Sequence, residues 1–227
     1  MGDVKEDTTM KAEPPVLEAG GLDPRTTATI QGRYNRQARF FDLTEALMER
    51  LLMRRWRRRQ WSMVSGPRVL EVGVGTGKNF PHYPSDVQVA AVDFSPKMLA
   101  RAVGKARKKS VPVSLGLMDA QSLAVPEACF DRVVSSFVFC SVPDPVLGLR
   151  EVRRVLRPGG RAILLEHMRS RNRVLGWLMD RLNGLCVRMS GANISRDTVA
   201  NVERAGLRVV SVQHLLGDVV KLIEAER

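Results

Sequence analysis

Blocks of apolar and polar positions along the chain predict an ordered series of strands and helices. Short, nearly continuous apolar runs are typical of buried parallel strands. Such runs, or shorter strand-like segments, occupy residues 69–72, 87–92, 111–117, 130–136 and 161–165. Helices are expected between them at 95–108 and 144–156. Strands and helices that alternate in this way form a parallel sheet that binds ligands at the carboxyl ends of its strands.

The flanking regions have helical and hairpin-like patterns. Residues 30–61 carry one apolar stripe at helical spacing and contain no proline. After the last parallel strand we expect further elements: an amphipathic helix over 175–189, a helix from 194 to about 206, and a closing pair of strands at 207–213 and 219–224.

A glycine-rich turn follows the first strand, in the run L-E-V-G-V-G-T-G over 70–77. A phosphate-binding P-loop would need glycine at Val72 and Ser or Thr at Asn79, so that motif does not fit. A dinucleotide fingerprint would need glycine or alanine at Lys78. The pattern G-x-G-x-G after an acidic residue fits at every position, although a tight strand-to-helix turn is the plainer alternative.

Acidic residues stand at the ends of the next two strands. Asp93 follows Gly73 by 20 residues and can accept hydrogen bonds from ribose hydroxyls. Asp119 lies just past the following strand, where a carboxylate can reach an adenine amino group. The two acids and the glycine turn together favour a nucleoside site over three separate helix caps or surface ion pairs.

Five segments between Arg68 and Arg161 occur in the order and spacing of a known family. They are L-E-V-G-V-G-T-G, V-D-F-S-P-K-M-L, M-D-A-Q-S-L, F-D-R-V-V-S and R-V-L-R-P-G-G. This series resembles the class I methyltransferases that use S-adenosylmethionine (SAM). Within that class it is similar to the type 11 branch, which includes methyltransferases of ubiquinone and menaquinone biosynthesis. Residues 34–42 resemble that branch's Y-x-x-x-A-x-x-Y-D signature, with Phe41 where tyrosine is usual.

Two narrower groups are also similar. Bacterial phosphatidylethanolamine N-methyltransferases share this architecture and a basic N-terminal helix that touches the membrane. Animal methyltransferase-like thiol S-methyltransferases resemble the chain in F-C-S-V over 139–142, in the segment 149–160, in Glu166-His167 and in N-x-[ST]-R over 193–196.

The resemblance implies an α/β, Rossmann-like fold: a seven-stranded, mostly parallel sheet with helices on both faces and the last strand antiparallel. We expect this domain over 65–227, with a helical insertion at about 170–193, an N-terminal helical cap over 26–64 and a disordered tail over 1–25. The implied cofactor is SAM, with S-adenosylhomocysteine as product. The residues expected to bind it are Glu71, Gly73, Gly75, Asp93, Phe94, Asp119, Ala120 and Ser136.

His167 and Tyr34 are the candidate catalytic residues. His167 ends the last predicted parallel strand on the acceptor side, where it is either a general base or a pocket wall, and Tyr34 is placed to close over it. The three cysteines have no paired spacing, which suggests a reducing compartment. We expect no metal, because no paired His/Cys spacing or acidic triplet is present.

The positive charge of the chain favours acidic binding partners. The formal net charge is +12, and five arginines lie within Arg54–Arg59, next to Trp56 and Trp61. This segment is either a solvated helix end or a surface for acidic headgroups or nucleic acid. No apolar run reaches the roughly 18 residues of a membrane span, and residues 1–23 lack an apolar signal region. We therefore expect a cytoplasmic protein that can contact the inner face of the membrane peripherally.

The leading functional hypothesis is methyl transfer to a small or lipidic acceptor at a membrane surface, first of all N-methylation of phosphatidylethanolamine-type amines. S-methylation of hydrophobic thiols and methylation of a quinone precursor are the alternatives. An RNA methyltransferase is disfavoured, because aromatic residues make up 5% and residues 135–138 lack an N-P-P-Y-like motif. A non-catalytic SAM-binding protein stays open, and no obligate protein partner is evident.

Overall fold

The computed structural model describes residues 16–17, 26–37, 52–190 and 192–227 of the 227-residue chain. The strands are β1 (Val16–Leu17), β2 (Arg68–Val72), β3 (Gln88–Asp93), β4 (Val113–Leu117), β5 (Phe130–Ser136), β6 (Leu156–His167), β7 (Arg208–Leu216) and β8 (Val220–Glu226). The helices are α1 (Thr26–Gln37), α4 (Arg54–Trp61), α5 (Pro96–Lys109), α6 (Pro145–Val155), α7 (Arg173–Ser190) and α8 (Thr198–Arg204), with a short 3₁₀ helix at Phe80–His82.

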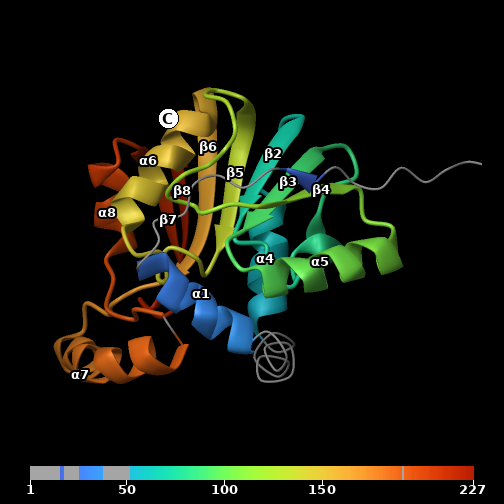
Figure 1. Ribbon diagram of the computed structural model, residues 1–227. Helices are drawn as coiled ribbons and strands as arrows, with labels where there is room; N and C mark the ends of the chain where they lie inside the picture. Colours follow the sequence, from blue (N-terminus) through green and yellow to red (C-terminus); the bar gives the residue numbers. More distant parts are fainter. Residues whose placement is uncertain (1–15, 18–25, 38–51, 191) are drawn as a thin grey trace, which may run out of the picture.

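The strands form one sheet in the order β1-β4-β3-β2-β5-β6-β8-β7 (Figure 1). Strands β2 to β6 pair in parallel, and β8 is antiparallel to both of its neighbours. The prediction of a seven-stranded sheet with an antiparallel last strand is confirmed for β2 to β8. The two residues of β1 add a parallel pairing beside β4, within the segment expected to be a disordered tail; the rest of 1–25 lies outside the described residues.

Helices cover both faces of the sheet, as expected. Alternate residues of a strand point to opposite faces: Leu70 packs in a cluster with α6 and α8, whereas Val69 packs with α5 and Trp61. The strand order reverses around β2, since β3 lies on one side of it and β5 on the other. In open α/β sheets this reversal leaves a crevice at the carboxyl ends of the strands, where a ligand binds.

Local signals explain most helix boundaries. Ser95 accepts a hydrogen bond from the Met98 amide, and Asp144 and Asp197 cap α6 and α8 in the same way. Helix α6 ends at Val155, and β6 already begins at Leu156, five residues earlier than the strand predicted at 161–165. The helical segment predicted over 30–61 contains α1 and α4, with 38–51 outside the described residues.

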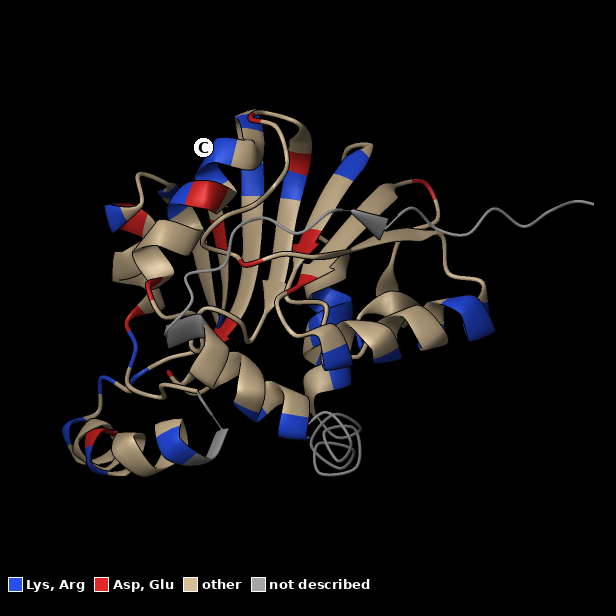
Figure 2. Cartoon of the chain, viewed as in Figure 1, with Lys and Arg blue, Asp and Glu red and all other residues tan. Residues whose placement is uncertain are grey.

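Helix α4 corrects the interpretation of the arginine-rich segment as a lipid-facing surface with two tryptophans. Trp56 and Trp61 are 7% and 1% exposed, and Arg57 is also buried. The tryptophans therefore belong to the core, against the sheet, and are not placed at a headgroup boundary. The exposed residues of the segment are Arg54, Arg55, Arg58 and Arg59, part of the blue band on α4 in Figure 2.

Buried Arg57 has specific partners. Its Nη1 donates to Asn79 Oδ1 at 3.0 Å, and its guanidinium lies 5.7 Å from the centre of the Phe137 ring. We expect Arg57→Ala to lower the free energy of unfolding by about 2 kcal/mol, because a charged hydrogen bond and a cation–π contact are lost. Arg58→Ala, on the exposed side of the same helix, should change it by less than about 0.5 kcal/mol. Urea denaturation measures both, and equal midpoints for the two variants would contradict the assignment.

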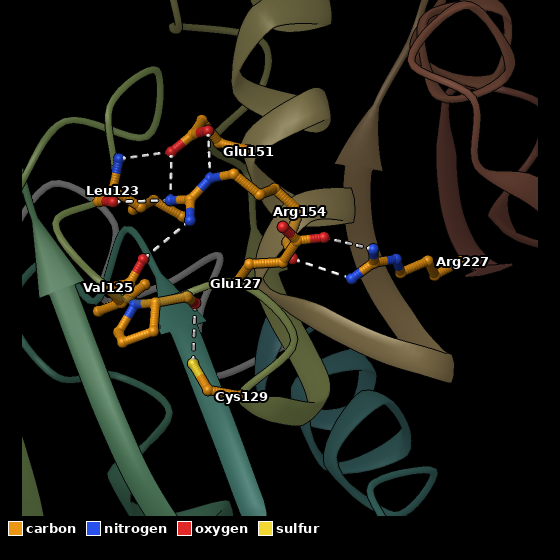
Figure 3. A network of polar contacts seen from close by, with 8 residues as sticks. Leu123, Val125, Glu127, Cys129, Glu151, Arg154 and Arg227 are labelled. Atoms are coloured by element: carbon orange, nitrogen blue, oxygen red, sulfur yellow. Dashed lines mark hydrogen bonds and ion pairs between the residues drawn. The ribbon is translucent and has the colours of Figure 1, made fainter.

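The connection between β4 and β5 is held by a polar network on α6 (Figure 3). Arg154 pairs with Glu151 at 2.7 Å and donates to the carbonyls of Leu123 and Val125 at 2.8 and 2.9 Å. Glu151 in turn accepts from the Leu123 amide at 2.9 Å. The loop that follows the predicted adenine-side residues is thereby fixed to the body of the domain.

Candidate active site

A cavity of about 740 Å³ lies at the carboxyl ends of β2 to β6. The predicted site residues that line it are Tyr34, Gly73, Gly75, Asp93, Phe94, Asp119, Ala120, Ser136 and His167. Glu71 is the one member of the predicted set that does not line it. Residues that are up to 133 positions apart in sequence, from Tyr34 to His167, thus meet in one space.

Two glycines of the turn after β2, Gly73 and Gly75, have different surroundings. Both have positive φ, +75° at Gly73 and +55° at Gly75. A Cβ on Gly73 would lie 2.3 Å from a methyl group of Val138, so this position needs glycine for packing. A Cβ on Gly75 would meet nothing within 4 Å. Since Gly75 lines the cavity, the open space above it is room for a ligand.

Asp93 connects the glycine turn to the start of α5. Its Oδ2 accepts from the Gly75 amide at 2.8 Å and its Oδ1 accepts from the Ser95 amide at 2.8 Å. Burial raises the pKa of Asp93 to about 6, against the lowering effect of these backbone hydrogen bonds. Each carboxylate oxygen has more than one acceptor position, so the side chain can take further hydrogen bonds from the cavity.

Glu71 lies behind the turn. Its Oε1 accepts from Asn79 Nδ2 at 2.6 Å, and its Oε2 accepts from the Tyr83 hydroxyl. Burial raises the pKa of Glu71 to about 7. Through Asn79 and Tyr83, Glu71 holds the segment that follows the glycine turn, and its contact with the cofactor stays a prediction.

Ser136 is similarly occupied by protein partners. Its Oγ donates to Gln60 Oε1 at 2.7 Å and accepts from Asn79 Nδ2 at 3.1 Å. Gln60, completely buried on α4, also donates to the carbonyls of Ser135 and Ile163 at 2.6 and 2.9 Å. Sequence reasoning missed Asn79 and Gln60, because their partners are distant in sequence and neither belongs to a motif.

Asp119 and Ala120 form the wall beyond β4. Asp119 is buried, and its Oδ1 accepts from the Gln121 amide at 2.9 Å. This Asx-type contact holds the carboxylate at the cavity surface. Ala120 follows it in the wall.

Helix α1 contributes Tyr34 to the cavity wall and contacts the segments that follow β3 and β5. The Tyr34 ring meets the Phe94 ring edge to face with centroids 5.5 Å apart, and the Tyr34 hydroxyl lies 2.6 Å from Ser141 Oγ. Gln31 Nε2 donates to the Phe94 carbonyl at 2.6 Å. Tyr34 thus bridges the segments that follow β3 and β5, which is how a cover over a bound ligand is held in place.

Glu166 is a buried carboxyl. In the sequence it stood out only as part of the Glu166-His167 pair. Its Oε1 accepts from the amides of Val138 and Phe139 at 3.0 and 3.1 Å. Burial raises the pKa of Glu166 to about 7. Phe137, just before these amides, has φ of +60°, so Glu166 stabilises a sharp turn that forms the cavity wall after β5.

His167, the last residue of β6, also lines the cavity. It is half-buried with its ring centre 6.5 Å from that of Phe137. Burial lowers the pKa of His167 below its ordinary value of 6.5, so the imidazole is neutral at pH 7 and able to accept a proton. Nearby Cys140 is different: burial raises the pKa of its thiol to about 12, which leaves it protonated. Among the described residues no group of three or more His, Cys, Asp or Glu is arranged to hold a metal.

Comparison with known proteins gives one family and several relatives. Residues 70–164 match the methyltransferase domain family. A phosphatidylethanolamine N-methyltransferase of Cereibacter sphaeroides is 45% identical over 104 residues, 45% of this chain and 51% of that protein. Human thiol S-methyltransferase TMT1A is 30% identical over 152 residues, 65% of this chain and 62% of that protein. A demethylmenaquinone methyltransferase of Renibacterium salmoninarum is 36% identical over 154 residues, 66% and 63% of the two chains. The match thus spans about half to two thirds of these relatives' lengths.

Solved structures show the fold. The [4+2]-cyclase SpnF has a TM-score of 0.68 at 15% identity, with 93% of this chain and 99% of that chain covered. A SAM-dependent methyltransferase of Thermotoga maritima has a TM-score of 0.65 at 22% identity, with 86% and 98% covered. Residues 70–164 thus form a domain of the methyltransferase family, on a fold shared with SAM-dependent methyltransferases, and the cavity lies at the ends of its strands.

Proposed function

We propose that the protein transfers a methyl group from SAM to a lipidic acceptor at a membrane surface, with a phosphatidylethanolamine-type amine as first choice. The observation that carries this proposal is the part of the cavity away from the glycine turn. Beside His167 its wall is mostly apolar and comes from two segments far apart in sequence: Met53 and Trp56 of one, and Leu216, Val219 and Val220 of the other, with Arg57 as a charged neighbour. An acceptor with a polar head and an apolar body fits such a wall.

The residues around the glycine turn fit the cofactor. Asp93 presents a buried carboxylate with remaining acceptor positions, suited to the two ribose hydroxyls. Asp119 suits an amino group of the base, and the open space at Gly75 admits the ligand close to the backbone. When bound, SAM supplies a methyl group on a sulfonium, already activated for displacement, so the protein's task is alignment and exclusion of water.

The acceptor side needs a proton acceptor when the substrate is an amine. An ammonium has no lone pair, so it must lose a proton before or during attack. His167 is neutral at pH 7 and lines the cavity, which are the two properties that a base requires here. Tyr34 has its hydroxyl close to Ser141, and we assign it to closing the site over the acceptor and not to proton transfer.

We expect His167→Ala to lower turnover by about a hundredfold, because a positioned base contributes on the order of 100- to 10,000-fold. Affinity for S-adenosylhomocysteine, measured by calorimetric titration, should stay within about twofold of wild type. His214→Ala, which changes an exposed histidine on β7, is the matched control and should leave both quantities unchanged. A loss of less than threefold with every accepted substrate would make His167 a wall of the pocket.

A hydrophobic thiol is the second candidate acceptor. The human thiol S-methyltransferase aligns with more of this chain than the phosphatidylethanolamine enzyme does, 65% against 45%, although at lower identity. A quinone precursor is the third, from the menaquinone enzyme. Because a [4+2]-cyclase shares the fold, methyl transfer itself also has to be measured.

Turnover of methyl-labelled SAM distinguishes these functions. Parallel reactions would contain phosphatidylethanolamine dispersed in detergent, an alkyl thiol, a polyprenyl quinol precursor and RNA. We expect label in the lipid fraction, as methylated headgroup. Label only in the thiol, the quinol or RNA would replace the proposed acceptor, and SAM binding without label in any fraction would indicate a non-catalytic protein.

The exposed arginines of α4 support a membrane location for this reaction. Arg54, Arg55, Arg58 and Arg59 keep their side chains on the surface. They follow Met53 and flank Trp56, both of which line the cavity. Arginines near an anionic leaflet contribute about 1 kcal/mol each to binding, less at high salt.

A further inference from the structure

Helix α7 (Arg173–Ser190) turns its apolar residues outward. The exposed large apolar side chains on it are Val174, Leu175, Trp177, Leu178, Leu182 and Leu185. Val174 is 76% exposed and Trp177 is 58% exposed. The side that faces the protein carries buried Gly176 and Met179 and half-buried Asn183. A surface helix of a globular domain normally has the opposite arrangement.

Five of the exposed apolar residues form one continuous face. At 100° per residue they fall within an arc of about 100°, from Val174 to Leu175. Trp177 lies about 60° beyond Val174, and Arg181 and Arg188 lie between the two. Contiguous apolar patches of this kind on a surface mark a binding site for a protein, a ligand or a membrane. No helix among the described residues is long and apolar enough to cross a bilayer. A membrane contact through α7 would place this helix along the membrane surface.

The charges beside this face are basic. Residues 169–190 contain five arginines and one aspartate, and that aspartate, Asp180, is paired with Arg169 at 2.8 Å. Arg181 lies over the Trp177 ring at 5.6 Å, on the same margin of the helix as Arg173 and Arg188. An apolar face bordered by tryptophan and arginine is what a helix in the plane of an anionic membrane surface presents.

Helix α7 is also attached to the mouth of the cavity. Arg33 Nη1 on α1 donates to the Val187 carbonyl at 2.6 Å, so α1 and α7 lie side by side (Figure 1). Tyr34, the next residue of α1, lines the cavity, as does Ala192, two residues beyond the end of α7. Whatever the outer face of α7 binds is therefore held close to the acceptor side of the site.

We infer that α7 lies in the headgroup region of an anionic membrane, with the apolar face toward the acyl chains and the arginines on phosphate groups. This surface replaces the tryptophans of α4, which are buried, as the apolar contact with lipid. The inference rests on the proposed function in one respect, namely that the acceptor comes from the lipid phase. Binding itself can be measured without turnover.

Trp177 is a built-in reporter for this contact. The chain has three tryptophans, and the other two are at most 7% exposed. With vesicles of phosphatidylcholine and phosphatidylglycerol, we expect the emission of the full chain to shift to shorter wavelength and to be quenched by brominated acyl chains. Both effects should be small with pure phosphatidylcholine and absent in Trp177→Phe. No shift and no quenching with the anionic vesicles would overturn the inference.

Two double variants test whether vesicle binding depends on α7 or on exposed apolar residues in general. Leu178→Glu with Leu185→Glu should weaken vesicle co-sedimentation at least tenfold, while S-adenosylhomocysteine affinity stays at the wild-type value. Leu147→Glu with Val210→Glu changes exposed side chains on α6 and β7 and should bind vesicles normally. Equal binding by both variants would overturn the inference, since each set replaces two exposed apolar side chains by glutamate and only one set lies on α7.

Other occupants of the face give different results. A blue shift that grows with protein concentration without vesicles, together with a doubled mass in light scattering, would show that the face joins a second copy of the chain. A blue-shifted monomer without vesicles would show that the chain's own residues cover the face. Either result overturns the inference. Vesicle binding through α7 without any lipid methylation would instead refute the proposed acceptor and support the surface.

Discussion

Asp93→Ala is expected to weaken S-adenosylhomocysteine binding about 30- to 700-fold, which corresponds to about 2–4 kcal/mol. The substitution removes the two carboxylate oxygens available to ribose hydroxyls in a cavity where water cannot replace them fully. It also removes the acceptor that holds the Gly75 amide in the turn. Calorimetric titration of the full chain measures the change.

Two further variants isolate the reason for that loss. Asp86→Ala makes the same change of charge at an exposed position before β3 and should bind S-adenosylhomocysteine normally. Asp93→Asn keeps the side-chain shape but replaces one oxygen by a donor, and we expect an intermediate loss of about tenfold or more. Affinity within threefold of wild type in Asp93→Ala would remove Asp93 from the cofactor site.

The pH dependence of binding gives a second readout of the same residue. Burial raises the pKa of Asp93 to about 6 in the free protein. Hydroxyl donors bind the ionised carboxylate best, so affinity should be constant above about pH 7 and should fall below pH 6, by at most tenfold per pH unit. In Asp93→Asn this fall should be absent. An identical pH profile in both proteins would assign the ionisation to another group.

The fold and the meeting of the predicted cofactor residues in one cavity were predictable because their signals are local. A strand buried on both faces has a nearly continuous apolar run, which located β3 within one residue. Shorter strand-like segments located β2 and β5 equally well. The position of Asp93 at the end of β3 follows from the end of such a run. Parallel strands bring their carboxyl ends to one edge, so the pattern of strands alone predicts that Asp93 and Asp119 converge.

The supporting residues were not predictable, because their partners come from distant parts of the chain. Arg57 belongs to a run of arginines that has every local property of a solvated helix end. It is buried because Asn79 and Phe137 supply a hydrogen bond and a ring. Glu166 is explained by two backbone amides beyond β5, which no side-chain motif records. Such contacts are set by tertiary packing, and local sequence carries little information on it.

Gly75→Val is expected to reduce S-adenosylhomocysteine binding by more than a hundredfold while the protein stays folded. The added side chain has no protein atom within 4 Å of its Cβ, so it fills space in the cavity without a clash. Its cost to stability comes from the left-handed backbone at φ +55°, about 1–3 kcal/mol for a residue other than glycine. Thermal denaturation and calorimetric titration separate the two effects.

Gly159→Val is the matched control for this prediction. Gly159 has φ of +74° and also open space around its Cβ, but it lies at the start of β6, at the other end of the strand from His167. It should lose similar stability and bind S-adenosylhomocysteine normally, whereas Gly73→Val should lose both stability and binding because of Val138. Backbone strain is common to all three variants, so only the occupied space can separate Gly75 from Gly159. If Gly75→Val and Gly159→Val bind equally well, the cofactor does not lie over the glycine turn.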